Sequence, residues 1–179
     1  VKNYLHTTTP ATTKTYQALI ETIANEPGLT TLVAQRGMRI IVDPHHKIFL
    51  DVLYPSDSQP GKDTNASSIV TKLTYNATSV LLTGDAPVSV ELFLEQADST
   101  GLQSTLLKLG HHGSKTSSAE SFLKVVNPSF AIISAGLNNR YNHPDPSVTA
   151  RLESLMIPYL QTKDEGTITF QSDGTTFRR

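Results

Sequence analysis

Two short stretches of this sequence bring together side chains that bind metal ions. Asp85 closes the run Leu82-Thr83-Gly84-Asp85, and the paired histidines His111 and His112 are flanked by Gly110 and Gly113. Each stretch follows a short apolar run of the kind that predicts a β-strand. A carboxylate and imidazoles suit zinc, manganese or iron, and such a metal lowers the pKa of a bound water to about 7. We therefore expect a divalent metal site (Zn or Mn), with Asp85, as the bridging candidate, and either or both histidines as ligands.

A third polar stretch follows a later apolar run. His143 lies in the loop 135–144 together with Asn139 and Arg140. An imidazole there could protonate a leaving alkoxide or hold a phosphate oxygen, and Arg140 could contact a phosphate. The alternative is that Asn139 and His143 only brace the turn. Ser114 and Lys115, which directly follow the histidine pair, are further candidates for contacts with a substrate.

The remaining histidines have simpler interpretations. His45 and His46 also form a pair, but they lie in a polar turn between Pro44 and Lys47, so we interpret them as solvent-exposed turn residues. No His-x-His or His-x-x-x-His cluster occurs in the chain. A catalytic metal usually has three protein ligands, so the candidates above are few for one metal and too few for two.

Composition limits the class of protein. The 179 residues, with 37% hydrophobic and 17% charged, predict one globular domain over residues 1–179. The formal net charge of −1 excludes a global positive field for nucleic acid, so such binding would need a local basic patch. The absence of cysteine excludes disulfides and thiolate metal sites. The chain begins at Val1, which suggests a processed protein or an excised fragment.

The pattern of apolar residues predicts a mixed α/β sheet. Strands 68–75 and 80–82, joined by a short turn, should pair antiparallel, and the following strands alternate with helices. If these later strands are parallel, their loops share one rim of the sheet. Arg36-Gly37 predicts a hairpin between strands 30–35 and 38–42, and the loop 56–67 should be the most flexible part. The other predicted strands cover 1–5, 48–54, 105–109, 129–134, 158–161, 166–171 and 175–178; helices begin at Thr12 or Thr13, near Pro87, at Ser117 or Ser118, and at about Ser147.

The motifs together resemble those of the metallo-β-lactamase-fold domain of the ComEC competence proteins. The resemblance covers essentially the whole chain and keeps the order and spacing of the motifs. Its residues are Leu82–Asp85 for the carboxylate motif, Leu107–Ser114 for the paired histidines, Ser134–Gly136 with Asn139–Pro144, Thr162–Ile168, Val52–Pro55 and Asn65–Val70.

This resemblance implies an αββα metallo-β-lactamase-like sandwich with a dinuclear metal site, in a domain attached to a membrane DNA-uptake channel on the extracytoplasmic side. It implies that Asp85 bridges the metals, that a histidine of the pair is a ligand, and that His143 lies on the substrate side. The family's main ligand motif, His-x-His-x-Asp-His, does not occur in this sequence. The chain therefore resembles the carboxyl-terminal portion of such a domain, without its first strands.

Two classes of function follow as hypotheses. The first is a metal-dependent phosphodiesterase, a nuclease acting on single-stranded DNA in DNA uptake, in which metal-bound hydroxide attacks phosphorus. A hydrolase of another phosphoester, such as a choline-phosphate ester, belongs to the same class. The second is a truncated, non-catalytic module that binds DNA or a partner, or forms a homodimer to cover its sheet.

Overall fold

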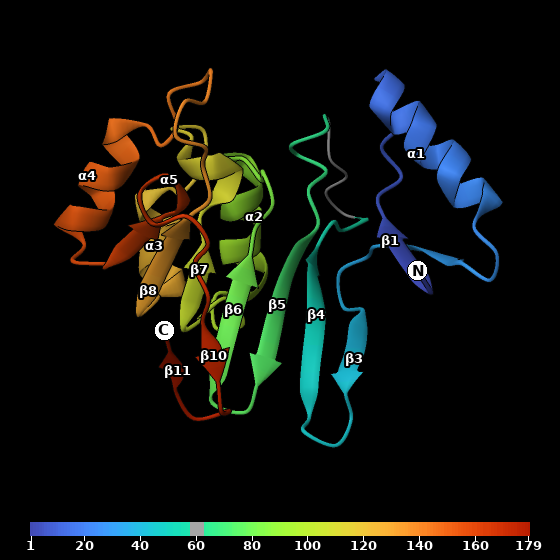
Figure 1. The fold of residues 1–179 in the computed structure, drawn as a ribbon. Coiled ribbons are helices and arrows are strands. Elements are labelled where there is room, and N and C mark those ends of the chain that lie inside the picture. The colour runs from blue at the N-terminus through green and yellow to red at the C-terminus, as the bar shows by residue number, and fades with distance from the viewer. Residues whose placement is uncertain (58–62) are drawn as a thin grey trace.

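A seven-stranded mixed sheet forms the centre of the computed structural model, which describes residues 1–57 and 63–179 (Figure 1). The sheet order is β3-β4-β5-β6-β7-β8-β9; the first four strands pair antiparallel and the last four parallel. This confirms the predicted antiparallel pair and the mixed sheet. The strands are β3 (Arg39–Asp43), β4 (Ile48–Tyr54), β5 (Val70–Tyr75), β6 (Thr78–Leu82), β7 (Leu106–Lys108), β8 (Phe130–Ile133) and β9 (Tyr159–Gln161).

Three helices cover one face of the parallel half of this sheet. They are α2 (Val88–Asp98), α3 (Glu120–Val126) and α4 (Pro146–Ser154). Alternate strand residues such as Leu81, Leu107 and Ile133 point toward the helices and are at most 1% exposed. Their partners include Phe122 and Leu123 of α3. Burial of this apolar layer holds the strands, and therefore the loops at their ends, in fixed positions.

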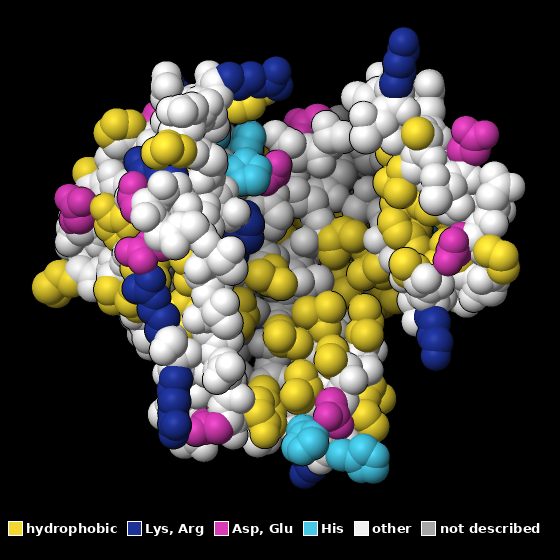
Figure 2. All heavy atoms as spheres, in the orientation of Figure 1, with side chains coloured by type: hydrophobic (Ala, Val, Ile, Leu, Met, Phe, Trp, Pro, Cys, Tyr) yellow, Lys and Arg dark blue, Asp and Glu magenta, His cyan; other side chains and the backbone are white. Residues whose placement is uncertain are grey.

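The opposite face of the sheet is only partly covered. A short hairpin of β10 (Gln171–Ser172) and β11 (Phe177–Arg178) lies over it, and the ring of Phe170 is 5.8 Å from that of Phe130. The predicted strands 166–171 and 175–178 are thus much shorter than expected, and α5 (Thr162–Glu165) precedes them. Apolar side chains gather on this face in Figure 2. They include the walls of a cavity of about 490 Å³ between the sheet and the hairpin.

The first part of the chain forms a separate pair of strands. β1 (Asn3–His6) pairs parallel with β2 (Thr30–Val33), and α1 (Lys14–Asn25) connects them. The predicted hairpin between strands 30–35 and 38–42 is therefore wrong. The backbone N–H groups of Arg36 and Gly37 donate to carbonyls of Pro55 and Val52, so this segment joins the β4 side instead of folding back on β2.

Sequence signals for the start of a helix were more reliable than the predicted pairing of strands. The Thr13 side chain accepts a hydrogen bond from the Tyr16 N–H at 3.1 Å, which confirms the predicted start of α1. Residues 58–62 of the loop predicted to be flexible lie outside the described residues. None of the helices in the described part of the chain is long and apolar enough to cross a membrane.

Candidate metal centre

The loops that follow β6, β7 and β8 are tied together by backbone hydrogen bonds. The His111 N–H donates to the Gly84 carbonyl at 3.0 Å, which joins the first two loops. The Asp145 N–H donates to the Gly113 carbonyl at 2.9 Å, which joins the second and third. Since β6, β7 and β8 are parallel neighbours, all three loops lie at one edge of the sheet, as the sequence predicted.

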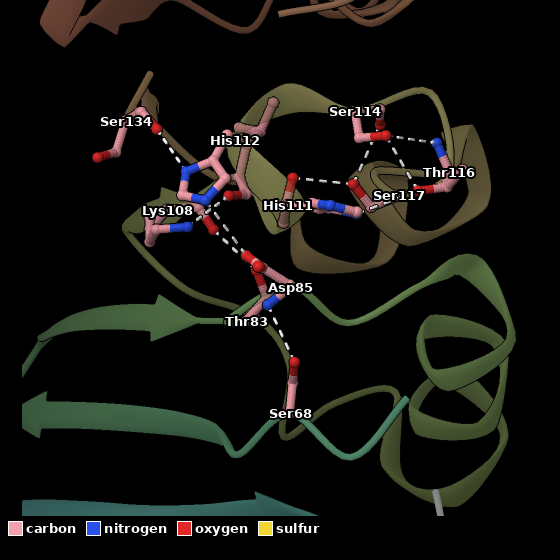
Figure 3. A network of polar contacts seen from close by, with 12 residues as sticks. Ser68, Thr83, Asp85, Lys108, His111, His112, Ser114, Thr116, Ser117 and Ser134 are labelled. Atoms are coloured by element: carbon pink, nitrogen blue, oxygen red, sulfur yellow. Dashed lines mark hydrogen bonds and ion pairs between the residues drawn. The ribbon is translucent and has the colours of Figure 1, made fainter. Parts of the chain in front are cut away.

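Asp85 and His112 face each other at this edge (Figure 3). Nε2 of His112 lies 3.7 Å from Oδ1 of Asp85. On the other side of the ring, Nδ1 donates to the Ser134 carbonyl oxygen at 2.7 Å. A carbonyl can only accept, so Nδ1 carries a proton. When the ring is neutral, its free lone pair is then on Nε2, toward Asp85. An imidazole oriented in this way by a backbone carbonyl is the usual arrangement of a metal-binding histidine.

The backbone around Asp85 also fixes its position. The Asp85 N–H donates to Oγ of Ser68 at 3.0 Å. Gly84 has φ +57°, and a Cβ there would lie only 3.0 Å from the Cβ of Ser68. A glycine is therefore required at this turn, both for its backbone angle and for the close approach of Ser68.

His111 points in another direction. Its Nδ1 lies 3.3 Å from Oγ1 of Thr116, and its ring centroid is 5.7 Å from that of His143. Both residues of the pair have left-handed backbone angles, with φ of 48° at His111 and 57° at His112. Such angles cost about 1–3 kcal/mol each in a non-glycine residue, and they concentrate at functional sites. The structure thus distinguishes the two histidines: His112 lies beside Asp85, and His111 lies beside His143.

His143 lies at the same edge of the sheet, in the loop that follows β8. Its Nδ1 is buried and has no hydrogen-bond partner among the described residues. Burial, and then the neighbouring His111 and His112, lower the pKa of His143, so the ring is neutral at neutral pH. Asn139 braces the loop: its side-chain NH₂ donates to the Gly136 and His143 carbonyls, and its oxygen accepts from the His143 N–H.

The donors present fit part of a metal site. The 3.7 Å between Nε2 of His112 and Oδ1 of Asp85 is close to the separation of about 3.4 Å between two ligands of a tetrahedral zinc ion. Within residues 1–57 and 63–179, no group of three or more His, Cys, Asp or Glu side chains is arranged to hold a metal. The described residues therefore bring two candidate ligands together, fewer than a catalytic zinc usually has.

The other candidate residues lie around this centre in different environments. Ser114 is only 5% exposed and its hydroxyl bonds to Thr116, so it stabilises the loop from inside. Lys115 is exposed, and so is Arg140, whose guanidinium carbon lies 4.6 Å from the centre of the Tyr141 ring. His45 and His46 are exposed in the β3–β4 turn, where His46 contacts Asp43.

Sequence reasoning missed several supporting residues. The carbonyl of Ser134 and the hydroxyl of Ser68 leave no signal in a pattern of residue types. Glu91 of α2 is 1% exposed, and its two oxygens accept from the Ser118 and Ala119 N–H groups at 2.6 and 2.9 Å. It therefore holds the turn that precedes α3. The N-cap position of this helix is Ala119, so the prediction that Ser117 or Ser118 caps it is wrong. The sequence contains one hint of the role of Glu91, because this charged residue interrupts the apolar residues of its helix.

A partly buried lysine lies near the same centre. The Lys108 amine, at the end of β7, donates to the Leu109 carbonyl at 3.0 Å. Burial lowers the pKa of Lys108, and the charge of Asp85 opposes that effect. Figure 3 shows Lys108 close to Asp85 and His112.

Comparisons with known proteins agree with these motifs. No protein-family model matches the chain. It is 38% identical over 120 residues to ComE operon protein 3 of Bacillus subtilis, 36% identical over 120 residues to competence protein ComA of Neisseria gonorrhoeae, and 43% identical over 88 residues to recombination protein 2 of Haemophilus influenzae. These matches cover 67%, 67% and 49% of this chain, but only 15%, 17% and 11% of the relatives.

A solved structure supports the fold. A protein of Parabacteroides distasonis, named as a metal-dependent hydrolase, aligns with a TM-score of 0.51 at 11% identity. The alignment covers 84% of this chain and 62% of that one. At this identity the likeness concerns the fold alone. The chain is thus homologous to the ComEC-family competence proteins over two thirds of its length, and its mixed α/β fold is metallo-β-lactamase-like.

Proposed function

We propose that this chain forms part of a metal-dependent phosphodiesterase, a nuclease acting in DNA uptake. One observation carries the proposal: the Nε2 lone pair of His112, set by the hydrogen bond from Nδ1 to Ser134, faces the Asp85 carboxylate. The homology to competence proteins and the hydrolase-like fold support the same conclusion. The whole protein would act outside the cytoplasm and be attached to a membrane.

In this proposal Asp85 and His112 bind a divalent metal, zinc or manganese. When bound, such a metal supplies a water of lowered pKa and neutralises charge on the phosphodiester. His143 is neutral at neutral pH because its pKa is lowered, so its ring N–H suits it to hold a phosphate oxygen. Arg140 and Lys115 are exposed cations near the same edge and would contact neighbouring phosphates.

The test is metal retention, with cleavage as a second measurement. We expect the chain to retain manganese or zinc after desalting, and we expect Asp85→Asn and His112→Ala to weaken the affinity at least about tenfold, since each removes one of two ligands. His45→Ala is the matched control, because it removes an exposed turn histidine. Equal losses in all three variants, or no retained metal at all, would contradict the proposal.

A second candidate follows from the small number of ligands. Among the described residues, no group of three or more potential ligands is arranged to hold a metal. The chain alone would then be a non-catalytic module that binds a DNA strand or dimerises. In that case a ligand from another segment or chain would be needed to complete the centre. Cleavage of a labelled DNA strand by the chain with manganese would exclude this candidate; strand binding without cleavage or metal retention would support it.

A further inference from the structure

A groove runs from His112 along the loop after β8. Its larger part is a cavity of about 590 Å³, lined among others by His112, Leu137, Tyr141 and Lys163. An adjoining cavity of about 450 Å³ shares Leu137, Asn139, His143 and Lys163 with it. Each volume is within the range of small-ligand sites, about 300–1,000 Å³. Together they offer room for a ligand that extends away from the Asp85–His112 pair.

The charge of this groove differs from that of the whole chain. The formal net charge is −1, yet no Asp or Glu lines either cavity, and Lys163 lines both. The guanidinium of Arg140 lies beside Tyr141, on the same loop. A groove whose walls carry a lysine and no carboxylate favours an anionic ligand.

The groove also carries exposed apolar surface. Leu137 is 70% exposed and Tyr141 is 62% exposed, and both line the larger cavity. The Tyr141 ring stacks on His143, with centroids 5.7 Å apart and an interplanar angle of 21°. Aromatic rings and guanidinium planes are the surfaces on which single-stranded nucleic acids stack their bases.

We propose that Leu137, Tyr141 and Lys163 form a nucleotide subsite for single-stranded nucleic acid. A base lies against Leu137 and Tyr141, and Lys163 contacts a phosphate next to it. This inference rests on the proposed function, because the neighbouring phosphodiester would then reach Asp85 and His112. A duplex keeps its base faces stacked inside, so it does not fit this subsite.

Binding of labelled oligonucleotides in the presence of a chelator tests the subsite without catalysis. The probes are a short DNA strand and an abasic strand with the same number of phosphates. We expect the abasic strand to bind more weakly by about tenfold, and Tyr141→Ala to weaken only the normal strand by a similar factor. Leu92→Ala, an exposed leucine on α2, is the matched control and should change neither.

Salt dependence tests the role of Lys163. Loss of one phosphate contact should reduce the slope of log affinity against log salt concentration by about 0.7. We expect this for Lys163→Gln and not for Lys14→Gln, an exposed lysine at the start of α1. An unchanged slope, equal affinity for both strands, or no binding of either strand would overturn the subsite.

The outcomes also separate the subsite from the proposed function. Base-dependent binding without metal retention or cleavage would refute the phosphodiesterase and leave the subsite standing. Cleavage with manganese, together with equal affinity for normal and abasic strands, would refute the subsite and keep the phosphodiesterase.

Discussion

At the scale of single residues, the sequence predicts Asp85 and the histidine pair as metal ligands, but it does not distinguish the two histidines. That difference depends on the Ser134 carbonyl, which lies 22 residues from His112 and fixes its tautomer. A pattern of residue types contains backbone carbonyls at every position, so it cannot show which carbonyl is close. Glycines at strand ends, in contrast, are visible in the sequence because tight turns require them.

Gly113, directly after the pair, gives a test at this scale. Its φ is +81°, and a Cβ there would lie 2.7 Å from the Cβ of Pro144. Gly28 has a similar φ of +74° with nothing within 4 Å. We expect Gly28→Ala to lower the free energy of unfolding by about 1–2 kcal/mol, from backbone strain alone. Gly113→Ala should cost a further 1–3 kcal/mol, roughly, because Pro144 must move. Urea unfolding measures both values, and equal costs would contradict the role of Pro144.

At the scale of elements, a helix cap formed by a residue close in the sequence was predictable, and a contact made by a residue of another helix was not. Thr13 caps α1 from three residues before Tyr16, a spacing that the sequence shows directly. The turn before α3 is held by Glu91 on another helix, 27 residues from Ser118. This contact links α2 to the segment that follows the histidine pair. Contacts between residues that are close in the sequence could be predicted. Contacts between elements that are far apart in the sequence, and that packing brings together, could not.

The buried carboxyl of Glu91 predicts a pH dependence of stability. Burial raises the pKa of Glu91 from 4.5 to about 7, although two N–H groups donate to it. The folded protein then holds a proton that the unfolded chain releases, so stability falls as pH rises from 4.5 to about 7. Between these two pH values the free energy of unfolding falls by up to about 1.4 kcal/mol per pH unit. Above about pH 7, Glu91 causes no further loss of stability.

Denaturant unfolding at several pH values checks this expectation. Glu91→Gln should remove that part of the slope, since glutamine does not titrate. Glu21→Gln, an exposed glutamate on α1, should leave the slope unchanged. The same slope in wild type and Glu91→Gln would show that Glu91 stays charged when buried.

At the scale of the whole molecule, the parallel half of the sheet was predictable because its strands alternate with helices. The wrong prediction of a hairpin between strands 30–35 and 38–42 has a physical reason. These two strands are adjacent in sequence, but β2 forms its backbone hydrogen bonds with the parallel strand β1, which precedes it in the chain and is connected to it by α1. In the structure, the described helices cover only one face of the parallel half of the sheet. That asymmetry leaves Leu73, Val80 and Phe177 around an open cavity.

This apolar face predicts measurable surface behaviour. We expect the chain to bind a hydrophobic fluorescent dye and to self-associate as its concentration rises, because exposed apolar patches favour association. Leu73→Lys puts a charge on the cavity wall and should lower dye fluorescence several-fold and restore a monomeric mass in sedimentation. Leu92→Lys, on the exposed side of α2, should leave both unchanged. Circular dichroism establishes that the Leu73 variant is folded. Equal dye binding by the two variants would mean that this face is closed in solution, and the open cavity would then not drive association.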